Sequence, residues 1–147
     1  MERATSWRKR FIELAMELRR LAGKPAQDFK DTPDMPVSMT FHVDDVLFEV
    51  VHFGDQTESP DQFLLQCRFG RVPLNDAAAV LEEALTMSHG MARNNAGMFA
   101  LDTQANELVC SSFQTLDGVE PQQLAGGVAQ IAALARQWRS AHSVVLH

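Results

Sequence analysis

One stretch of sequence decides the fold: Val37-Ser-Met-Thr-Phe-His-Val43, Asp44-Asp45, Val46-Leu-Phe-Glu-Val-Val-His-Phe53. It has the pattern of two strands joined by a two-residue turn. A turn of that length pairs Val43 with Val46, and the pairs that follow place alternate residues on opposite faces. One predicted face is wholly apolar and must be buried; it consists of Met39, Phe41, Val43, Val46, Phe48 and Val50. The other face is mixed; it consists of Ser38, Thr40, His42, Leu47, Glu49 and Val51.

Three helices and three more strands are predicted around this hairpin. Apolar residues recur every three or four positions in the helical segments and every second position in the third strand. In chain order, the predicted segments are a helix over 6–22, strands over 37–43, 46–53 and 62–69, a helix over 75–91, strands over 97–101 and 107–116, and a helix over 121–141. This order separates the helices from an antiparallel sheet, so the predicted fold class is α+β.

The length of 147 residues is usual for one domain, and an apolar fraction of 46% supplies enough side chains for a core. We expect a single domain over residues 1–147, with its core at about 6–141, a loop over 24–36 and a tail over 142–147. No apolar stretch reaches the roughly 18 residues that span a bilayer, and the N-terminus is polar and basic. We therefore expect a soluble, cytoplasmic protein without membrane insertion.

The net charge of −6 argues against a nucleic-acid partner, because phosphate contacts need a basic surface. It is compatible with a basic protein partner. Arg8-Lys9-Arg10 and Arg19-Arg20 are interpreted as a solvated helix face. Cys67 and Cys110 have no ligand-spaced Cys or His nearby, so we expect free thiols in a reducing compartment.

The residue types that carry catalysis form no recognisable constellation in this sequence. There is no Gly-rich phosphate loop between a strand and a helix, and no serine has a nucleophile-elbow context. His42 and His52 could form a metal site with Asp44 only if they clustered, and the hairpin pairing places the two histidines on opposite faces. We expect no enzyme activity, no cofactor and no metal.

The helix predicted over 75–91 is apolar around an unusually large part of its girth, which indicates burial on two sides, one of them a subunit contact. Gly126-Gly127 lies inside the last predicted helix, where each glycine costs roughly 1 kcal/mol relative to alanine. A close approach by another backbone would explain that pair.

Three stretches resemble a known family. They are Phe69-Gly70-Arg71-Val72-Pro73-Leu74 with Leu81 and Leu85, then Gly97-Met98-Phe99-Ala100-Leu101-Asp102 with Glu107-Leu108-Val109, and Ala135-Arg-Gln-Trp138. Their order and spacing resemble the type III secretion chaperones of the Tir-chaperone (class I effector chaperone) family, over about residues 6–141. The chain departs from the family at Thr86-Met87-Ser88-His89, where many members carry Ala-Asn, and at Gly126-Gly127.

The resemblance implies a bacterial cytoplasmic homodimer that serves virulence by holding the extended N-terminal chaperone-binding segment of a secreted effector, which stays soluble and export-competent. The dimer contact is expected on the second helix and second hairpin, at Val80, Leu81, Ala84, Met87 and Val109. The effector-binding groove is expected on the first helix and first sheet, at Phe11, Ile12, Met16, Leu47 and Val51.

Two other functions remain open at this point. A domain with this plan could be a non-secretory scaffold that binds a folded regulatory partner. A small enzyme or metal-binding protein centred on His42 and His52 is the third hypothesis. A stoichiometric metal would favour that third hypothesis, whereas a metal-free dimer that co-purifies with an effector fragment would favour the chaperone.

Overall fold

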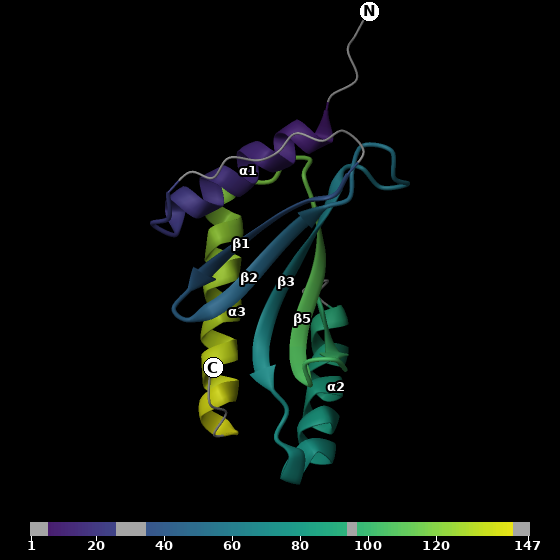
Figure 1. Ribbon diagram of the computed structural model, residues 1–147, viewed down its shortest axis with the longest axis vertical. Coiled ribbons are helices and arrows are strands. Elements are labelled where there is room, and N and C mark those ends of the chain that lie inside the picture. Colours follow the sequence, from purple (N-terminus) through teal and green to yellow (C-terminus); the bar gives the residue numbers. More distant parts are fainter. Residues whose placement is uncertain (1–5, 26–34, 94–96, 143–147) are drawn as a thin grey trace, which may run out of the picture.

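The computed structural model describes residues 6–25, 35–93 and 97–142. Residues 26–34 of the expected loop and 143–147 of the expected tail lie outside them, and the extent of the domain stays a prediction. The elements are α1 (Trp7–Leu21), β1 (Val37–Val43), β2 (Val46–His52), β3 (Gln62–Arg71), the 3-10 turn η1 (Leu74–Asp76), α2 (Ala77–Arg93), β4 (Met98–Asp102), β5 (Glu107–Thr115) and α3 (Pro121–Ala141) (Figure 1). The predicted order and the α+β class are confirmed.

The strands form one antiparallel sheet in the order β1-β2-β3-β5-β4. Both β1 and β4 are therefore edge strands, and β3 pairs with β5 rather than with β4. One cross-strand row contributes a buried residue from each strand, and neighbouring members pair directly across the strands. The row is Phe41, Phe48, Cys67, Cys110 and Phe99.

The first hairpin has the register that the sequence predicts. Val43 pairs with Val46, and the pairing continues to Val37 and His52. Asp44 and Asp45 both have positive φ, 48° and 69°, which is the backbone of a type I′ turn. The twist of such a turn matches that of the strands, which explains why two aspartates suffice without a glycine.

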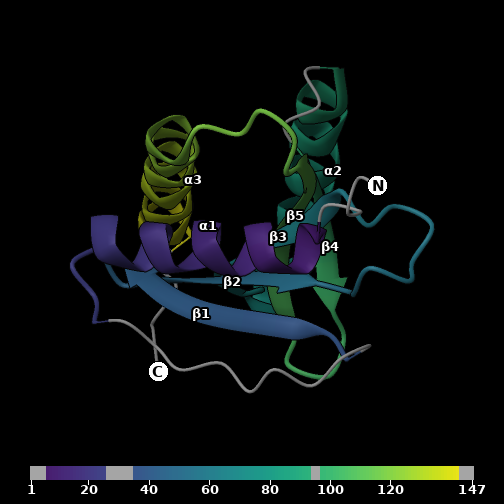
Figure 2. The same cartoon turned by 90° about the horizontal axis from the view of Figure 1, so that it is seen from above.

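All three helices cover the same face of the sheet, as Figure 2 shows from above. The Phe11 ring of α1 packs 5.7 Å from the ring of Phe63, and the Trp138 ring of α3 packs 6.0 Å from that of Phe69. The α1 and α3 helices also pack on each other, whereas α2 packs on β4. The core therefore lies between one sheet face and the helices, and no described helix covers the other face.

Helix α1 begins and ends as the sequence predicts. The Ser6 hydroxyl accepts a hydrogen bond from the backbone N–H of Lys9 at 3.2 Å, which is an N-cap. Gly23 follows the helix with a φ of +75°, a backbone that L side chains rarely adopt. This fixes the length of the helix that runs beside β1.

Arg139 ties the end of α3 to the sheet. Its guanidinium donates to the carbonyls of Phe69 and of Arg68, the latter at 2.9 Å, beside the irregularity in the pairing of β3 with β5. A third bond reaches the Asp45 carbonyl at 3.3 Å. One buried guanidinium thus satisfies backbone carbonyls that a bulge and a turn leave without ladder partners.

The second helix was predicted from about Asn75, with Asn75 or Asp76 as its N-cap; residues Leu74–Asp76 form a 3-10 turn and α2 begins at Ala77. One prediction about the last helix is wrong. The Gly126-Gly127 pair was expected to face another backbone. No atom beyond the glycines' own surroundings lies within 4 Å of a Cβ built at either position, so among the described residues nothing approaches closely.

Replacing a buried ring of the cross-strand row should cost much more than replacing an exposed ring of the same sheet. Phe48 is fully buried, whereas Phe113 is 64% exposed. We expect Phe48→Ala to lower the free energy of unfolding by about 3–5 kcal/mol, and Phe113→Ala by about 0.5 kcal/mol or less. Urea denaturation followed by circular dichroism measures both, and equal losses would contradict the assignment of the covered face.

Candidate functional site

One flank of α1 faces the outer edge of β1. Arg8, Ile12, Met16 and Arg19 are spaced by four, four and three residues, which places them on one stripe of the helix. The guanidinium of Arg8 donates to the carbonyl of Met35, just before β1 begins. The Nη1 of Arg19 donates to the carbonyl of Thr40 at 2.9 Å. The stripe therefore touches the start and the middle of the edge strand.

The two spacings agree with a helix that runs alongside the strand. Arg8 and Arg19 are eleven residues apart, about 16 Å along an α-helix. Met35 and Thr40 are five residues apart, also about 16 Å along an extended chain. Ile12 and Met16, both half-buried, lie on the stripe between the two arginines.

The outer edge of β1 presents backbone groups to a partner. Because Val43 and Val46 close the two-residue turn, every second residue from Val43 back exchanges hydrogen bonds with β2. The residues between them direct their N–H and C=O groups outward; they are Ser38, Thr40 and His42. The contact of Arg19 with the Thr40 carbonyl agrees with this direction. We call these three residues with Arg8, Ile12, Met16 and Arg19 the β1-edge surface.

The five residues predicted for the effector groove do not share one surface. Phe11 is 1% exposed and belongs to the core, packed on His52 and Phe63. Ile12 and Met16 lie on the β1-edge surface. Leu47 and Val51 are half-buried on the sheet face that no described helix covers. The sequence pattern assigned each residue to the correct element, but it did not show that α1 and these two β2 residues lie on opposite sides of the sheet.

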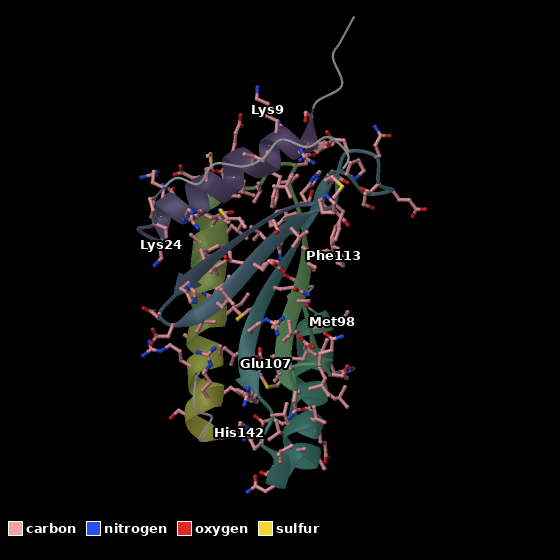
Figure 3. The ribbon with its side chains drawn as sticks, viewed as in Figure 1. Lys9, Lys24, Met98, Glu107, Phe113 and His142 are labelled. Atoms are coloured by element: carbon pink, nitrogen blue, oxygen red, sulfur yellow. The ribbon has the colours of Figure 1, made fainter. Side chains whose placement is uncertain are left out.

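Val51 belongs to an apolar row on the uncovered face. It pairs with Leu64, and Leu64 pairs with Phe113. Met98 of β4, 60% exposed, lines the same hollow as Phe113, and both are labelled in Figure 3. The prediction named Leu47 and Val51 from the alternation in the first hairpin; the alternation in β3, which places Leu64 on the same face as Gln66 and Arg68, was the signal that could have extended this row.

The other end of the uncovered face is polar. Arg68 donates to the carboxylates of Asp102 at 3.1 Å and of Glu107 at 2.9 Å. The backbone N–H of Ala105 and the Arg68 guanidinium hold the pKa of Asp102 below its usual value. The apolar row therefore occupies only the half of this face away from the β4–β5 turn.

Helix α2 carries two apolar stripes on adjacent sides. The first packs on the sheet and holds Ala77, Val80, Ala84, Met87 and Met91. The second holds Leu74 of the preceding 3-10 turn η1 with Ala78, Leu81 and Leu85 of α2, spaced by four, three and four residues; Leu81 is half-buried against the core, whereas Ala78 is exposed. Leu74 is 90% exposed and Leu85 is 70% exposed. We call this second set the leucine stripe.

The predicted dimer-contact residues are only partly accessible. Val80, Ala84 and Val109 are buried within the chain, so they do not form an exposed surface. Met87 is half-buried on the packed stripe, and Leu81 lies on the leucine stripe. The helix is apolar on two adjacent sides, as its sequence predicts, but a helical wheel cannot say which side meets the sheet, and Val80 and Ala84 pack on the core. The subunit contact itself stays a prediction.

Gly127 lines a groove of about 540 Å³ between α3 and the end of β5. Apolar side chains from three elements share its lining, among them Leu65, Met91, Val128, Ile131 and Leu134. The glycine widens the groove because no Cβ projects there.

The histidines hypothesised to bind metal lie on opposite faces of the hairpin. His52 is fully buried; its Nε2 lies 2.7 Å from the Pro60 carbonyl and its Nδ1 accepts from the Gly54 N–H at 3.2 Å. Both ring nitrogens are thus used by backbone groups. Among residues 6–25, 35–93 and 97–142, no three His, Cys, Asp or Glu residues gather as a metal site. None of the helices in that part of the chain has the length and apolarity that a membrane span requires.

Comparison with known proteins gives a consistent family. The model of the Tir chaperone protein (CesT) family matches residues 39–139. A chain of the HopA1–SchA chaperone–effector complex matches with a TM-score of 0.65 and 13% identity, covering 94% of this chain and 99% of that one. A chain of the ExsC–ExsE complex matches with a TM-score of 0.66 and 12% identity, covering 91% and 94%.

A third solved structure is the Yersinia pestis type III secretion chaperone SycH in complex with a stable fragment of YscM2. It matches with a TM-score of 0.57 and 13% identity, covering 87% of this chain and 98% of that one. At such low identities these structures show the shared fold. No curated protein sequence matches the chain significantly.

The paired cysteines should be inert in the folded chain. Cys67 and Cys110 face each other across β3 and β5, and burial raises the pKa of Cys67 to about 12 and of Cys110 to about 11. At pH 8 about one thiol in a thousand or fewer is then ionised. We expect almost no reaction with Ellman's reagent at pH 8 in buffer and two thiols per chain in guanidinium. Rapid reaction of both thiols in buffer would contradict their burial.

Proposed function

Since the chain belongs to the Tir chaperone protein (CesT) family, and is thus a type III secretion effector chaperone and not an enzyme, we propose that it holds the N-terminal segment of a secreted effector in an extended form. The observation that carries this function is the family match over residues 39–139, combined with a sheet in which no other described strand pairs with the outer edges of β1 and β4. The proposed site of action is the bacterial cytoplasm, before the effector is exported.

Open sheet edges suit a client that must stay unfolded. A strand added at an edge is held by backbone hydrogen bonds, which any sequence can make, while side-chain contacts at alternate positions give selectivity. The described structure has two such edges, β1 and β4. An extended client held in this way needs no unfolding step before it enters a secretion channel.

Apolar surface beside an edge adds to this binding. Ile12 and Met16 lie beside β1, and methionine adapts to differently shaped client side chains. The apolar row of Val51, Leu64 and Phe113 on the uncovered face is a second surface that the same client could cover. Burying about 100 Å² of apolar area is worth roughly 2.5 kcal/mol, so a few side chains suffice for selectivity.

We infer that two copies of the chain associate through the leucine stripe of α2. Leu74 in η1 and Leu85 in α2 are large apolar residues that are 90% and 70% exposed, far more than a solvated surface requires. A stripe of this kind is self-complementary, because a two-fold axis brings the same residues from two chains together. A dimer would present two β1 edges to one client.

The chaperone function is tested with a client from the same genome. Co-expression with a secreted effector encoded beside this gene should yield a stable complex, in which limited proteolysis leaves an N-terminal effector fragment protected. Nuclear magnetic resonance of that labelled fragment should show an extended chain without a fold of its own. An effector that binds only through its folded domain would instead support the scaffold function.

The dimer is tested at Leu85. An aspartate there would be desolvated in the proposed contact, so we expect Leu85→Asp to weaken dimerisation at least roughly thirtyfold, the factor for a loss of about 2 kcal/mol at one interface anchor. Ala79→Asp, on an exposed side of α2 away from the stripe, is the matched control and should remain dimeric. Sedimentation velocity over a concentration series measures both. A monomeric wild-type chain, or a dimeric Leu85→Asp variant, would refute the contact.

A further inference from the structure

The positive charge of this acidic chain is concentrated on and around α1. Six of its 13 basic residues fall between Ser6 and Pro25, whereas only two of its 19 acidic residues do. Lys9 and Lys24 mark the two ends of that segment in Figure 3. The seven residues of the β1-edge surface include two arginines, Arg8 and Arg19, and no carboxylate, although the net charge of the chain is −6.

Arg19 occupies a backbone group that a client strand would need. Its Nη1 donates to the outward carbonyl of Thr40 at 2.9 Å, and its Nε donates to the carbonyl of Pro25 at 3.0 Å. An incoming strand pairs with β1 by donating its own N–H to that same Thr40 carbonyl. Charged side chains placed on edge strands are a common protection against unwanted pairing. Arg19 thus protects the middle of the β1 edge while no client is bound.

A client strand beside β1 has alternate side chains on the α1 side of the sheet. There they meet Ile12 and Met16, which favours apolar residues. A client that takes the Thr40 carbonyl also displaces the guanidinium of Arg19, which then needs a new acceptor. A carboxylate is the best acceptor for it, because the planar guanidinium can donate two parallel hydrogen bonds to the two oxygens.

Resting on the proposed chaperone function, we propose that the β1 edge binds a client strand that combines apolar side chains facing α1 with an acidic residue, and that Arg19 moves from the Thr40 carbonyl to that carboxylate. Arg19 therefore has two roles: it blocks edge pairing in the free chain and selects an acidic client in the complex. This differs from the basic client that the net charge alone suggests, because the local charge at the edge has the opposite sign.

The probes are three synthetic peptides labelled with fluorescein. In each peptide, valine alternates with threonine, so all valines point to the same side of the strand. The first and the last position on that side carry Glu in one peptide, Gln in the second and Lys in the third. Binding is measured by fluorescence anisotropy at low and high salt, with the full chain and its variants. Arg20→Ala is the matched control, because Arg20 is one residue further on and pairs with Glu17 on the exposed side of α1.

We expect the wild-type chain to bind the Glu peptide roughly two- to fivefold more tightly than the Gln peptide, the range of an exposed ion pair, and the Lys peptide most weakly. The Arg19→Ala variant should bind the Glu and Gln peptides equally. It should bind the Gln peptide more tightly than the wild type does, because no guanidinium competes for the Thr40 carbonyl. Arg20→Ala should keep the wild-type preference. Equal binding of the Glu and Gln peptides to the wild-type chain would overturn the proposal.

The edge itself is tested by Thr40→Pro, which removes an outward N–H but no hydrogen bond to β2. We expect it to weaken the binding of all three peptides about tenfold, the factor for one lost hydrogen bond of about 1.4 kcal/mol, whereas Thr40→Ala should not. Circular dichroism confirms that both variants are folded. If Thr40→Pro binds like Thr40→Ala, the edge is not the site.

The same variants are then tested for co-purification with the effector. If every variant retains the effector and binds the three peptides equally well, Arg19 and the β1 edge do not have the proposed role, but the chaperone function stands. If the wild-type chain does not bind the effector, the chaperone function itself is overturned.

Discussion

A five-stranded antiparallel sheet must bury its apolar face, and every other feature of this chain follows from how that burial is achieved. The row from Phe41 to Phe99 crosses all five strands, so the covered face is one continuous surface and the helices must all lie on the same side. Once α1, α2 and α3 are on that side, none of them can cover the opposite face or close the edges of β1 and β4. Edge strands of this kind are normally a hazard for aggregation. In the proposed function they are the part of the structure that a chaperone needs, because an edge can bind a backbone without requiring a particular sequence.

The three helices have different tasks beyond covering the core. Helix α3 closes the centre of the sheet and is tied to it by Arg139. Helix α1 runs beside β1 and places apolar and basic side chains next to the open edge. Helix α2 packs on β4 and leaves Leu85 of the leucine stripe exposed. The proposed client edge and the proposed subunit contact thus lie at opposite ends of the strand order, so a dimer formed through α2 would leave both β1 edges accessible. Electrostatics follows the same division, since the basic residues gather on α1 while the rest of the chain is acidic.

The first hairpin shows how much of this structure a sequence can predict. Its register follows from a period of two on both sides of a two-residue turn, since a slip by one residue would expose the whole apolar face. Helix α3 was predicted with the same reasoning at its observed bounds, Pro121–Ala141. The candidate binding residues were harder to predict than the strands and helices, because a binding surface depends on which elements become neighbours in the fold. Periodicity showed that Met16 lies off the core stripe of α1, yet only the fold shows that it lies beside β1. The hydrogen bond from Arg19 to the Thr40 carbonyl joins residues 21 positions apart, and nothing in the local sequence pattern indicates it.

The central claim is that a client strand adds to the outer edge of β1. Residue-resolved hydrogen exchange, measured by nuclear magnetic resonance with and without a bound effector segment, tests it most directly. The amides of Met39 and Phe41 already bond to β2, so their exchange should be slow in both states. Those of Ser38, Thr40 and His42 should exchange fast in the free chain and become protected on binding, in the alternating pattern of a newly paired strand. Unchanged exchange at these three amides in a saturated complex would contradict the account.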